Sequence, residues 1–320
     1  MKEFLVVEAG ERAPQRLRRK ALDLTDDAIA GLDQIRGSDP AAIHAVRRRL
    51  KELRALTRIL GTSSEEGFFR DAGRELAAAR DAKAALEAFD KLQKRFKDDW
   101  KPKQFQKIRR SLSERVGPDV DAATIERLRG GLIVERGRIA AWTVDEMRRD
   151  DLWDAVARSY RRARRGMRNA VEERTPAAIH EWRKRVKMHW YHDQFLAMVN
   201  LARLEPQIER LRDLSRTLGE HHDVVLVSDL CRRSPELFGS TRYVKSFQRF
   251  IERRLTELED EAEHAGGDLF AEKPKAWIAR VREEASSEPR RIGPKKSPRR
   301  APGRRAAVPA AVAGHLAQRR

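Results

Sequence analysis

The sequence is poor in cysteine and in aromatic residues. Cys231 is the single cysteine among 320 residues, and aromatic residues make up only 6%. One cysteine cannot form a disulfide within the chain or build a cysteine-rich zinc site. No apolar run approaches the about 20 residues of a membrane span, and the apolar stretch near the N-terminus is too short for a signal peptide. We therefore expect a soluble, cytoplasmic protein.

Sequence signatures of catalysis are also missing. The chain has no glycine-rich phosphate loop, no GxSxG elbow and no carboxylate cluster suited to hold Mg²⁺. Two histidine groups could suggest zinc: His189 with His192, and His221 with His222 and Asp223. Such spacing is common by chance, and neither a cysteine partner nor an HExxH pattern accompanies it. We therefore expect no enzyme, no metal site and no cofactor.

Charge of one sign is what the sequence has in excess. It contains 69 Lys and Arg residues against 50 Asp and Glu residues, a formal net charge of +19. A field of this sign attracts polyanions such as nucleic acid, anionic membranes or polyphosphate. Most of the excess is arginine, whose planar guanidinium binds phosphate through two hydrogen bonds and stays charged at any biological pH.

The last part of the chain differs from the rest in composition. Residues 286–320 are rich in Pro, Gly, Ala and Arg, and they contain ten Lys or Arg residues against one Glu. This composition predicts a disordered basic tail after a folded domain at 1–285. Such a tail either adds nonspecific affinity for polyanions or is simply solvated.

Apolar residues recur at three- and four-residue steps to about residue 265, which predicts an all-helical protein. Asp39-Pro40 and Thr175-Pro176 each place a capping side chain before a proline at the first helical position. Breaks in the pattern predict helices at about 11–36, 40–60, 68–97, 102–116, 120–149, 151–173, 177–200, 205–219, 221–233 and 241–264.

An internal repeat is the most informative pattern. Residues 39–60 and 175–196 align without gaps and are identical at nine positions, several of them basic. A second motif follows each copy, Arg70-Asp71-x-x-Arg74 and later Arg212-Asp213-x-x-Arg216. The repeat predicts a duplicated helical bundle with approximate two-fold symmetry, with halves at about 1–150 and 151–285 and a helical hairpin around 100–149.

The basic residues of the first copy lie at offsets of three, seven and ten from a histidine, so they share one helix face about 15 Å long. A single basic face is more often a solvated surface, but two matching copies favour an anion-binding function. The like charges on such a face repel each other, and an anion lying along the face would offset that repulsion. Tyr191 adds a hydroxyl donor to the second copy. The candidate binding residues of the two copies are His44, Arg47, Lys51, Arg54, His180, Arg183, Lys187 and Tyr191.

Each copy is preceded by a segment that is itself basic. The segment before the second copy has five arginines within eight residues, too many to pair with the nearby acids. If each segment packs antiparallel to the helix that follows it, the positive faces could line one groove, although about half of these arginines should face water. The candidates from the two segments are Arg16, Arg19, Lys20, Tyr160, Arg161, Arg164, Arg165 and Arg168.

The doubled His-x-x-Arg-x-x-x-Lys helix, with the basic segment at 160–165 and the Arg-Asp motifs, resembles the CHAD (histidine α-helical) domain family over about residues 10–265. The resemblance implies two four-helix bundles related by a pseudo-two-fold axis around a basic cleft. It also implies binding of inorganic polyphosphate and association with polyphosphate granules. Trp190 departs from the family pattern, which has an arginine there. The chain begins directly with helical segments, so we do not expect the triphosphatase activity of relatives with an additional N-terminal domain.

Two functions of different classes remain open from the sequence. The first is noncatalytic binding of polyphosphate, a flexible polyanion that requires Arg, Lys and His donors but no aromatic stacking surface. The alternative is nonspecific binding of nucleic acid, driven by overall charge and the basic tail. Hydrolysis of polyphosphate or nucleotides is a third function that we do not expect.

Overall fold

The computed structural model describes residues 11–35, 40–62, 65–76, 78–97, 102–114, 120–199 and 204–287. These residues form α-helices and short 3-10 segments and contain no β-strand, which confirms the predicted all-α class. Residues Met1–Ser286 form one compact unit. From residue 288 onward, the predicted basic tail lies outside the described residues.

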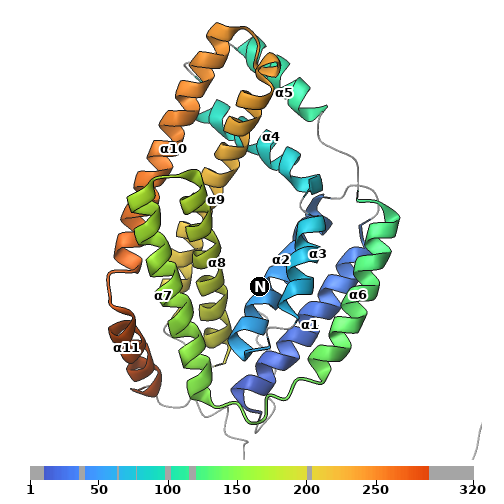
Figure 1. Cartoon of the computed structure of the whole chain (residues 1–320), viewed down its shortest axis with the longest axis vertical. Coiled ribbons are helices and arrows are strands. Elements are labelled where there is room, and N and C mark those ends of the chain that lie inside the picture. The colour runs from blue at the N-terminus through green and yellow to red at the C-terminus, as the bar shows by residue number, and fades with distance from the viewer. Residues whose placement is uncertain are drawn as a thin grey trace, which may run out of the picture. The chain divides into compact units, whose positions relative to one another are not determined.

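Most of the helices are joined to the next one along the chain by a short connection (Figure 1). Their bounds are α1 (Ala13–Asp33), α2 (Pro40–Leu60), α3 (Glu66–Glu75), α4 (Ala78–Arg95), α5 (Pro102–Ser113), α6 (Ala122–Ala140), α7 (Arg149–Glu173), α8 (Pro176–Met198), α9 (Glu205–Arg233), η2 (Pro235–Phe238), α10 (Thr241–Leu269) and α11 (Pro274–Ser287).

Two predictions of where helices divide were wrong. The segment predicted as one helix at 68–97 is divided between α3 and α4 at Leu76, which turns fully into the core. The helices predicted at 205–219 and 221–233 are one continuous helix, α9. A glycine inside a helix costs only about 1 kcal/mol. Gly219 can therefore be accommodated because both flanking segments of α9 bury apolar side chains.

The region after α6 also departs from prediction. The helix predicted to continue to residue 149 ends at Ala140, because the backbone then turns to bury Trp142 and Val144. The Trp142 indole N–H donates a hydrogen bond of 3.3 Å to Glu65 Oε1. This contact joins the end of α6 to the residue that precedes α3.

Helices α1 and α2 pack together as one pair, and α7 and α8 pack as another. Each pair has a glycine at which an added side chain would crowd the partner helix. A Cβ added at Gly31 of α1 would lie 2.7 Å from Val46 Cγ2, and one added at Gly166 of α7 would lie 3.3 Å from Trp182 Cα. Larger side chains at these positions would force the helices apart.

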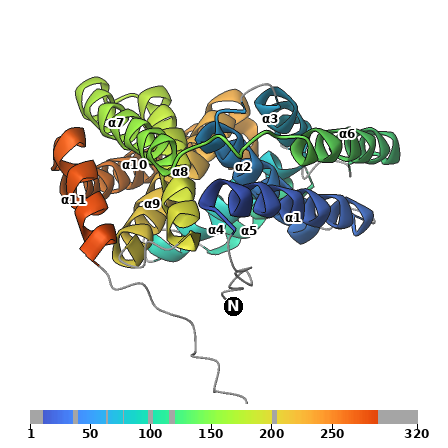
Figure 2. The same cartoon turned by 90° about the horizontal axis from the view of Figure 1, so that it is seen from below.

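The basic helices α2 and α8 contact each other at the centre of the molecule. Figure 2 shows α3 and α7 on one side of these two helices, and α1 and α9 on the other. One hydrophobic core joins α1, α2, α3, α7, α8 and the first part of α9. A second core joins α4, α5, the last part of α9 and the first part of α10, and in it the Phe89 and Phe105 rings stack with centroids 4.3 Å apart.

Helix α11 was not predicted, yet the side chain of Trp277 in its first turn is fully buried. The Trp277 ring stacks on Tyr160 of α7 with centroids 4.3 Å apart and an interplanar angle of 6°. Its indole N–H donates a hydrogen bond of 3.2 Å to Gln207 Oε1 of α9. The period of α11 is hard to recognise in the sequence because only one of its faces, with Trp277 and Val281, reaches the core.

Replacing Trp277 by alanine should lower the free energy of unfolding by about 3–5 kcal/mol, because it removes a buried aromatic ring and leaves a cavity. Urea denaturation followed by circular dichroism measures this change. Lys275→Ala, at an exposed position of the same helix, is the control and should change stability by less than about 0.5 kcal/mol. Equal unfolding midpoints for the two variants would contradict the docking of α11.

Candidate functional site

The basic helices begin as their sequences predict. The Thr175 hydroxyl accepts a hydrogen bond of 3.2 Å from the backbone N–H of Ala178, so it caps α8, and Pro176 takes the first helical position. Asp39, the corresponding residue before α2, lies outside the described residues. In α8 the apolar residues Ile179, Trp182 and Val186 are buried, which leaves the intervening basic residues beside the core.

A pocket of about 830 Å³ opens between α2, α3, α7, α8 and α9. Thirteen Lys and Arg residues line it, with three histidines and only two acids, Glu181 and Asp223. The formal charge of the lining is therefore +11 before any histidine is protonated. Its basic residues are Arg47, Lys51, Arg54, Arg58, Arg70, Arg74, Arg158, Arg162, Arg165, Arg183, Lys184, Arg185 and Lys187.

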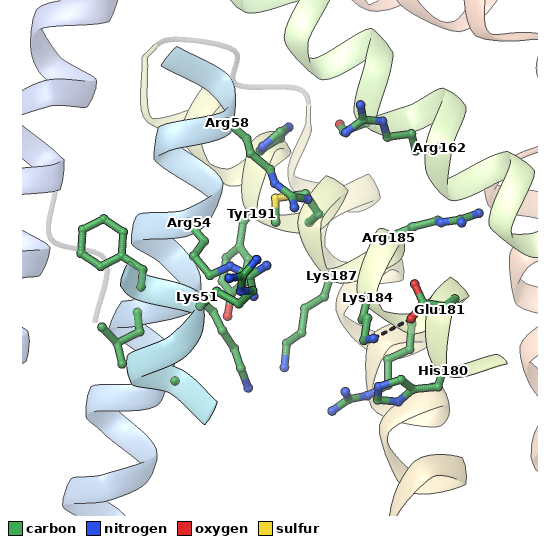
Figure 3. A pocket seen from close by; sticks show the side chains of 18 of the residues that line it. Lys51, Arg54, Arg58, Arg162, His180, Glu181, Lys184, Arg185, Lys187 and Tyr191 are labelled. Atoms are coloured by element: carbon green, nitrogen blue, oxygen red, sulfur yellow. Dashed lines mark hydrogen bonds and ion pairs between the residues drawn. The ribbon is translucent and has the colours of Figure 1, made fainter. Parts of the chain in front are cut away.

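Half of the sequence-predicted site residues lie in this lining. Figure 3 shows Lys51 and Arg54 of α2 on one wall, with Lys187 of α8 across from them. Helix α7 adds a basic row on the third side. The predicted residues that the structure brings together are Arg47, Lys51, Arg54, Arg165, His180, Arg183, Lys187 and Tyr191.

The candidates from α1 lie outside the pocket lining. Arg16 is almost fully buried, and its guanidinium donates a hydrogen bond of 2.7 Å to the carbonyl of Met198. Arg19 forms an ion pair of 2.8 Å with Glu11. Lys20 is half-buried in α1. We expected α1 and α2 to line one groove together, but none of the three α1 candidates lines the pocket. Arg16 and Arg19 contact Met198 and Glu11 instead.

His44 and four of the five α7 candidates also lie outside the lining. His44 is exposed in the first turns of α2, before the part of that helix that reaches the pocket. Tyr160 is fully buried and donates a hydrogen bond of 3.0 Å to the carbonyl of Glu272, and burial raises the pKa of Tyr160 to about 12. Arg164 donates to the carbonyl of Phe270 at 2.9 Å. These two side chains hold the segment between α10 and α11.

Arg161 and Arg168 are exposed on α7 but do not line the pocket. The pocket-facing residues of this helix are instead Arg158, Arg162 and Arg165, at steps of four and three residues. This spacing places them on one helix face. The sequence pattern alone could have identified that row, but not which of the basic rows on α7 faces the pocket.

Other lining residues were missed because they were assigned a supporting role or none. Arg70 and Arg74 belong to the first Arg-Asp motif, and both line the pocket from α3. Asp71 holds Arg70 through hydrogen bonds of 2.9 and 3.0 Å and lies 3.5 Å from Arg74. The remaining basic residues and histidines that were missed are Arg58, Arg158, Arg162, Lys184, Arg185, His192 and His222.

A single acid also positions two arginines of α2. Glu66 of α3 accepts hydrogen bonds from Arg58 at 2.5 Å and from Arg54 at 3.3 Å. Burial alone would raise the pKa of Glu66, but the hydrogen bonds and charges of these two arginines lower it. The carboxylate therefore stays ionised and fixes both guanidinium groups at the pocket wall.

Two imidazole rings meet where α8 and α9 contribute to the pocket. The rings of His180 and His222 have centroids 4.4 Å apart. Burial, followed by the charges of Lys184 and Arg183, lowers the pKa of His180 from its ordinary value of 6.5. His180 is therefore neutral at neutral pH, and a negative charge bound nearby would favour its protonation.

A buried polar cluster includes Ser159, a residue of the pocket lining. Ser159 Oγ lies 3.0 Å from His189 Nδ1, and Asp193 Oδ1 lies 3.4 Å from the same nitrogen. A serine–histidine–acid relay needs the serine and the acid on opposite ring nitrogens. Because both contact Nδ1 here, the cluster is a structural network rather than a nucleophilic triad.

No group of three or more His, Cys, Asp or Glu side chains in the described ranges could hold a metal ion. His189 and His192, which the sequence suggested as a pair, point into different surroundings. His192 donates a hydrogen bond of 3.1 Å from Nε2 to the carbonyl of Ala55, whereas His189 contacts Ser159. Within the same ranges, no helix combines the length and apolar character that crossing a membrane requires.

The family model of the CHAD domain matches residues 16–232 of the chain. This match includes α2, α3, α7, α8 and nearly all of α9, the five helices that line the pocket. No curated protein and no solved structure matches the chain.

The buried His192 should make the protein sensitive to acid. Burial lowers the pKa of His192 to about 3, whereas the unfolded chain binds a proton near pH 6.5. Its contribution to stability is therefore present above pH 6.5 and is lost as the pH falls, by about 1.4 kcal/mol per pH unit. His192→Gln keeps a donor for Ala55 and cannot titrate. Between pH 6.5 and 5, the free energy of unfolding of the His192→Gln variant should fall less steeply than that of the wild type, by up to about 1.4 kcal/mol per pH unit. If the two proteins instead lose stability with pH in parallel, His192 does not take up a proton on unfolding.

Proposed function

Since the chain belongs to the CHAD domain family, we propose that it binds inorganic polyphosphate in the pocket between α2, α3, α7, α8 and α9 and does not catalyse a reaction on it. The observation that carries the proposal is the convergence of thirteen Lys and Arg side chains on one pocket that has only two acids. Those cations come from four helices, α2, α3, α7 and α8, and the fold holds them together against their mutual repulsion. A bound polyanion would relieve that repulsion.

The chemistry of the lining favours a phosphate polymer over a nucleic acid. Proteins that bind single-stranded nucleic acid combine a basic groove with aromatic rings on which bases stack. The aromatic residues in this lining other than histidine are Phe69 and Tyr191, and both are buried. Polyphosphate has no bases and can be held by guanidinium and ammonium groups alone.

Binding without catalysis is supported by the two acids of the lining. Enzymes that transfer phosphoryl groups position metal ions and a nucleophile at the reacting phosphorus atom. Glu181 forms an ion pair of 2.5 Å with Lys184. Asp223 is the second acid, and it shares the lining with thirteen Lys and Arg residues. The lining is therefore suited to hold and neutralise a phosphate chain.

We further propose that the two pairs α1–α2 and α7–α8 are copies related by approximate two-fold symmetry, and that polyphosphate binding brings the protein to polyphosphate granules. The copies are supported by the aligned sequences of α2 and α8 and by the glycines at the contact within each pair, Gly31 and Gly166. Granule association follows from affinity for the polymer that forms the granule.

The wild-type protein should bind long-chain polyphosphate more tightly than single-stranded DNA of matched charge at about 0.15 M salt. Isothermal titration calorimetry with both polymers measures this preference. A chain truncated after Ser287 should keep the preference, because the pocket is intact. Equal affinities for the two polymers, or loss of the preference on truncation, would favour nonspecific nucleic-acid binding instead.

Removal of two pocket arginines tests the site. Arg158→Ala with Arg162→Ala should weaken polyphosphate binding by about tenfold or more, because two charge-assisted phosphate contacts are lost. Arg161→Ala with Arg168→Ala is a matched control, with the same charge change at exposed positions of α7 that do not line the pocket. The control should bind nearly as the wild type does, and equal weakening by both pairs would place the binding outside the pocket.

A further inference from the structure

The second Arg-Asp motif is not part of the pocket, although the first one is. Arg212 and Arg216 of α9 are absent from the lining, whereas Arg70 and Arg74 of α3 belong to it. The local arrangement is nevertheless the same in both motifs. Asp213 lies 3.8 Å from Arg212 and 3.3 Å from Arg216, and so it stands between them as Asp71 stands between the pocket pair.

The face of α9 that carries these two arginines leads directly into the pocket. Arg212, Arg216, Gly219, Asp223 and Leu226 follow one another at steps of four, three, four and three residues, which places them on one face of the helix. Asp223 and Leu226 line the pocket. Arg212 lies about 16 Å from Asp223 along the axis, at ~1.5 Å per residue.

Gly219 connects the two parts of this face. A Cβ added at Gly219 would lie 3.7 Å from Nε of Arg183, a residue of the pocket lining. The absence of a side chain at this point leaves the α9 surface open beside the Arg183 guanidinium. Cationic groups are therefore spaced along one helix surface, from Arg183 in the pocket to Arg216 and Arg212 outside it.

The two Arg-Asp motifs lie on opposite sides of the central helices. Figure 2 shows α3 on one side of α2 and α8 and α9 on the other. Helix α1 lies on the same side as α9, and its Asp26 and Asp27 form ion pairs with Arg136 and Arg49. On that side, α9 offers the basic surface on which a chain leaving the pocket can continue.

The arginines of the second motif can exchange partners at little cost. The side chains of Arg212 and Arg216 are 56% and 74% exposed, and Asp213 is 52% exposed. An ion pair with this much exposure contributes about 0–1 kcal/mol. A phosphate group offers each guanidinium two charge-assisted hydrogen bonds in place of that pair.

On the basis of the proposed function, we infer that Arg212 and Arg216 form a second anion-binding site, which holds a phosphate chain whose other end occupies the pocket. The site has the chemistry of an internal phosphate of a linear polymer, since two guanidinium groups four residues apart can contact successive phosphates. The affinity for polyphosphate should therefore depend on the length of the polyphosphate chain. A long polyphosphate reaches both sites, whereas tripolyphosphate is held by the pocket alone.

The test compares Arg212→Ala with Arg216→Ala against a matched control on the same helix. Arg232 and Arg233 form ion pairs with Asp229 near the end of α9, and Arg232 lies on the face opposite Arg212. Arg232→Ala with Arg233→Ala therefore removes the same charge from an equally exposed pair. Calorimetric titrations with tripolyphosphate and with long-chain polyphosphate are made for the full-length wild type and both variants.

The Arg212/Arg216 variant should bind long-chain polyphosphate about tenfold more weakly than the control, with a plot of log affinity against log salt less steep by about 1 to 2. Its affinity for tripolyphosphate should equal that of the control. Long-chain binding equal to the control would overturn the second site, and so would equal losses for both ligands. Failure of the wild type to bind either ligand would instead contradict the proposed pocket function.

Discussion

The fold must hold many positive charges around one pocket against their mutual repulsion. At an effective dielectric constant of about 20, two unit charges about 8 Å apart repel by about 2 kcal/mol, and thirteen cations line this pocket. The fold meets this repulsion with apolar faces packed behind each basic helix and with acids placed outside the lining. Glu66 and Asp71 on α3 hold four arginines at the wall without themselves lining the pocket.

The buried polar cluster that contacts Ser159 of the pocket lining adds no positive charge near neutral pH. Burial lowers the pKa of both His189 and His192 to about 3, and it raises the pKa of Asp193 to about 8. All three groups are therefore neutral near pH 7, and they serve as hydrogen-bonding links between helices. Asp193 also accepts a hydrogen bond of 2.6 Å from Gln207, whose carbonyl oxygen accepts one from Trp277. The same polar cluster thus connects the pocket to α11.

The part of the chain beyond the family match is integral to the fold. The match ends at residue 232, near the end of α9. Yet Gly266 of α10 approaches Trp182 of α8 so closely that an added Cβ would lie 2.6 Å from the indole ring. Trp277 of α11 stacks on Tyr160 of α7. Helices α10 and α11 therefore cover the outer surface of the helices that present the basic residues.

Local spacing in the sequence determined the all-helical class, the capped start of α8 and the two basic helices, because helix period and capping depend on residues within a few turns of each other. Tertiary structure decided which basic residues line the pocket. On α7 the sequence marks five of the nine residues from 160 to 168 as candidates, but burial of Tyr160 against Trp277 fixes the rotation of the helix. That rotation directs Arg158, Arg162 and Arg165 to the pocket and leaves Arg161 and Arg168 outside it. The convergence of five helices depends on contacts between residues far apart in the chain, which no local pattern contains.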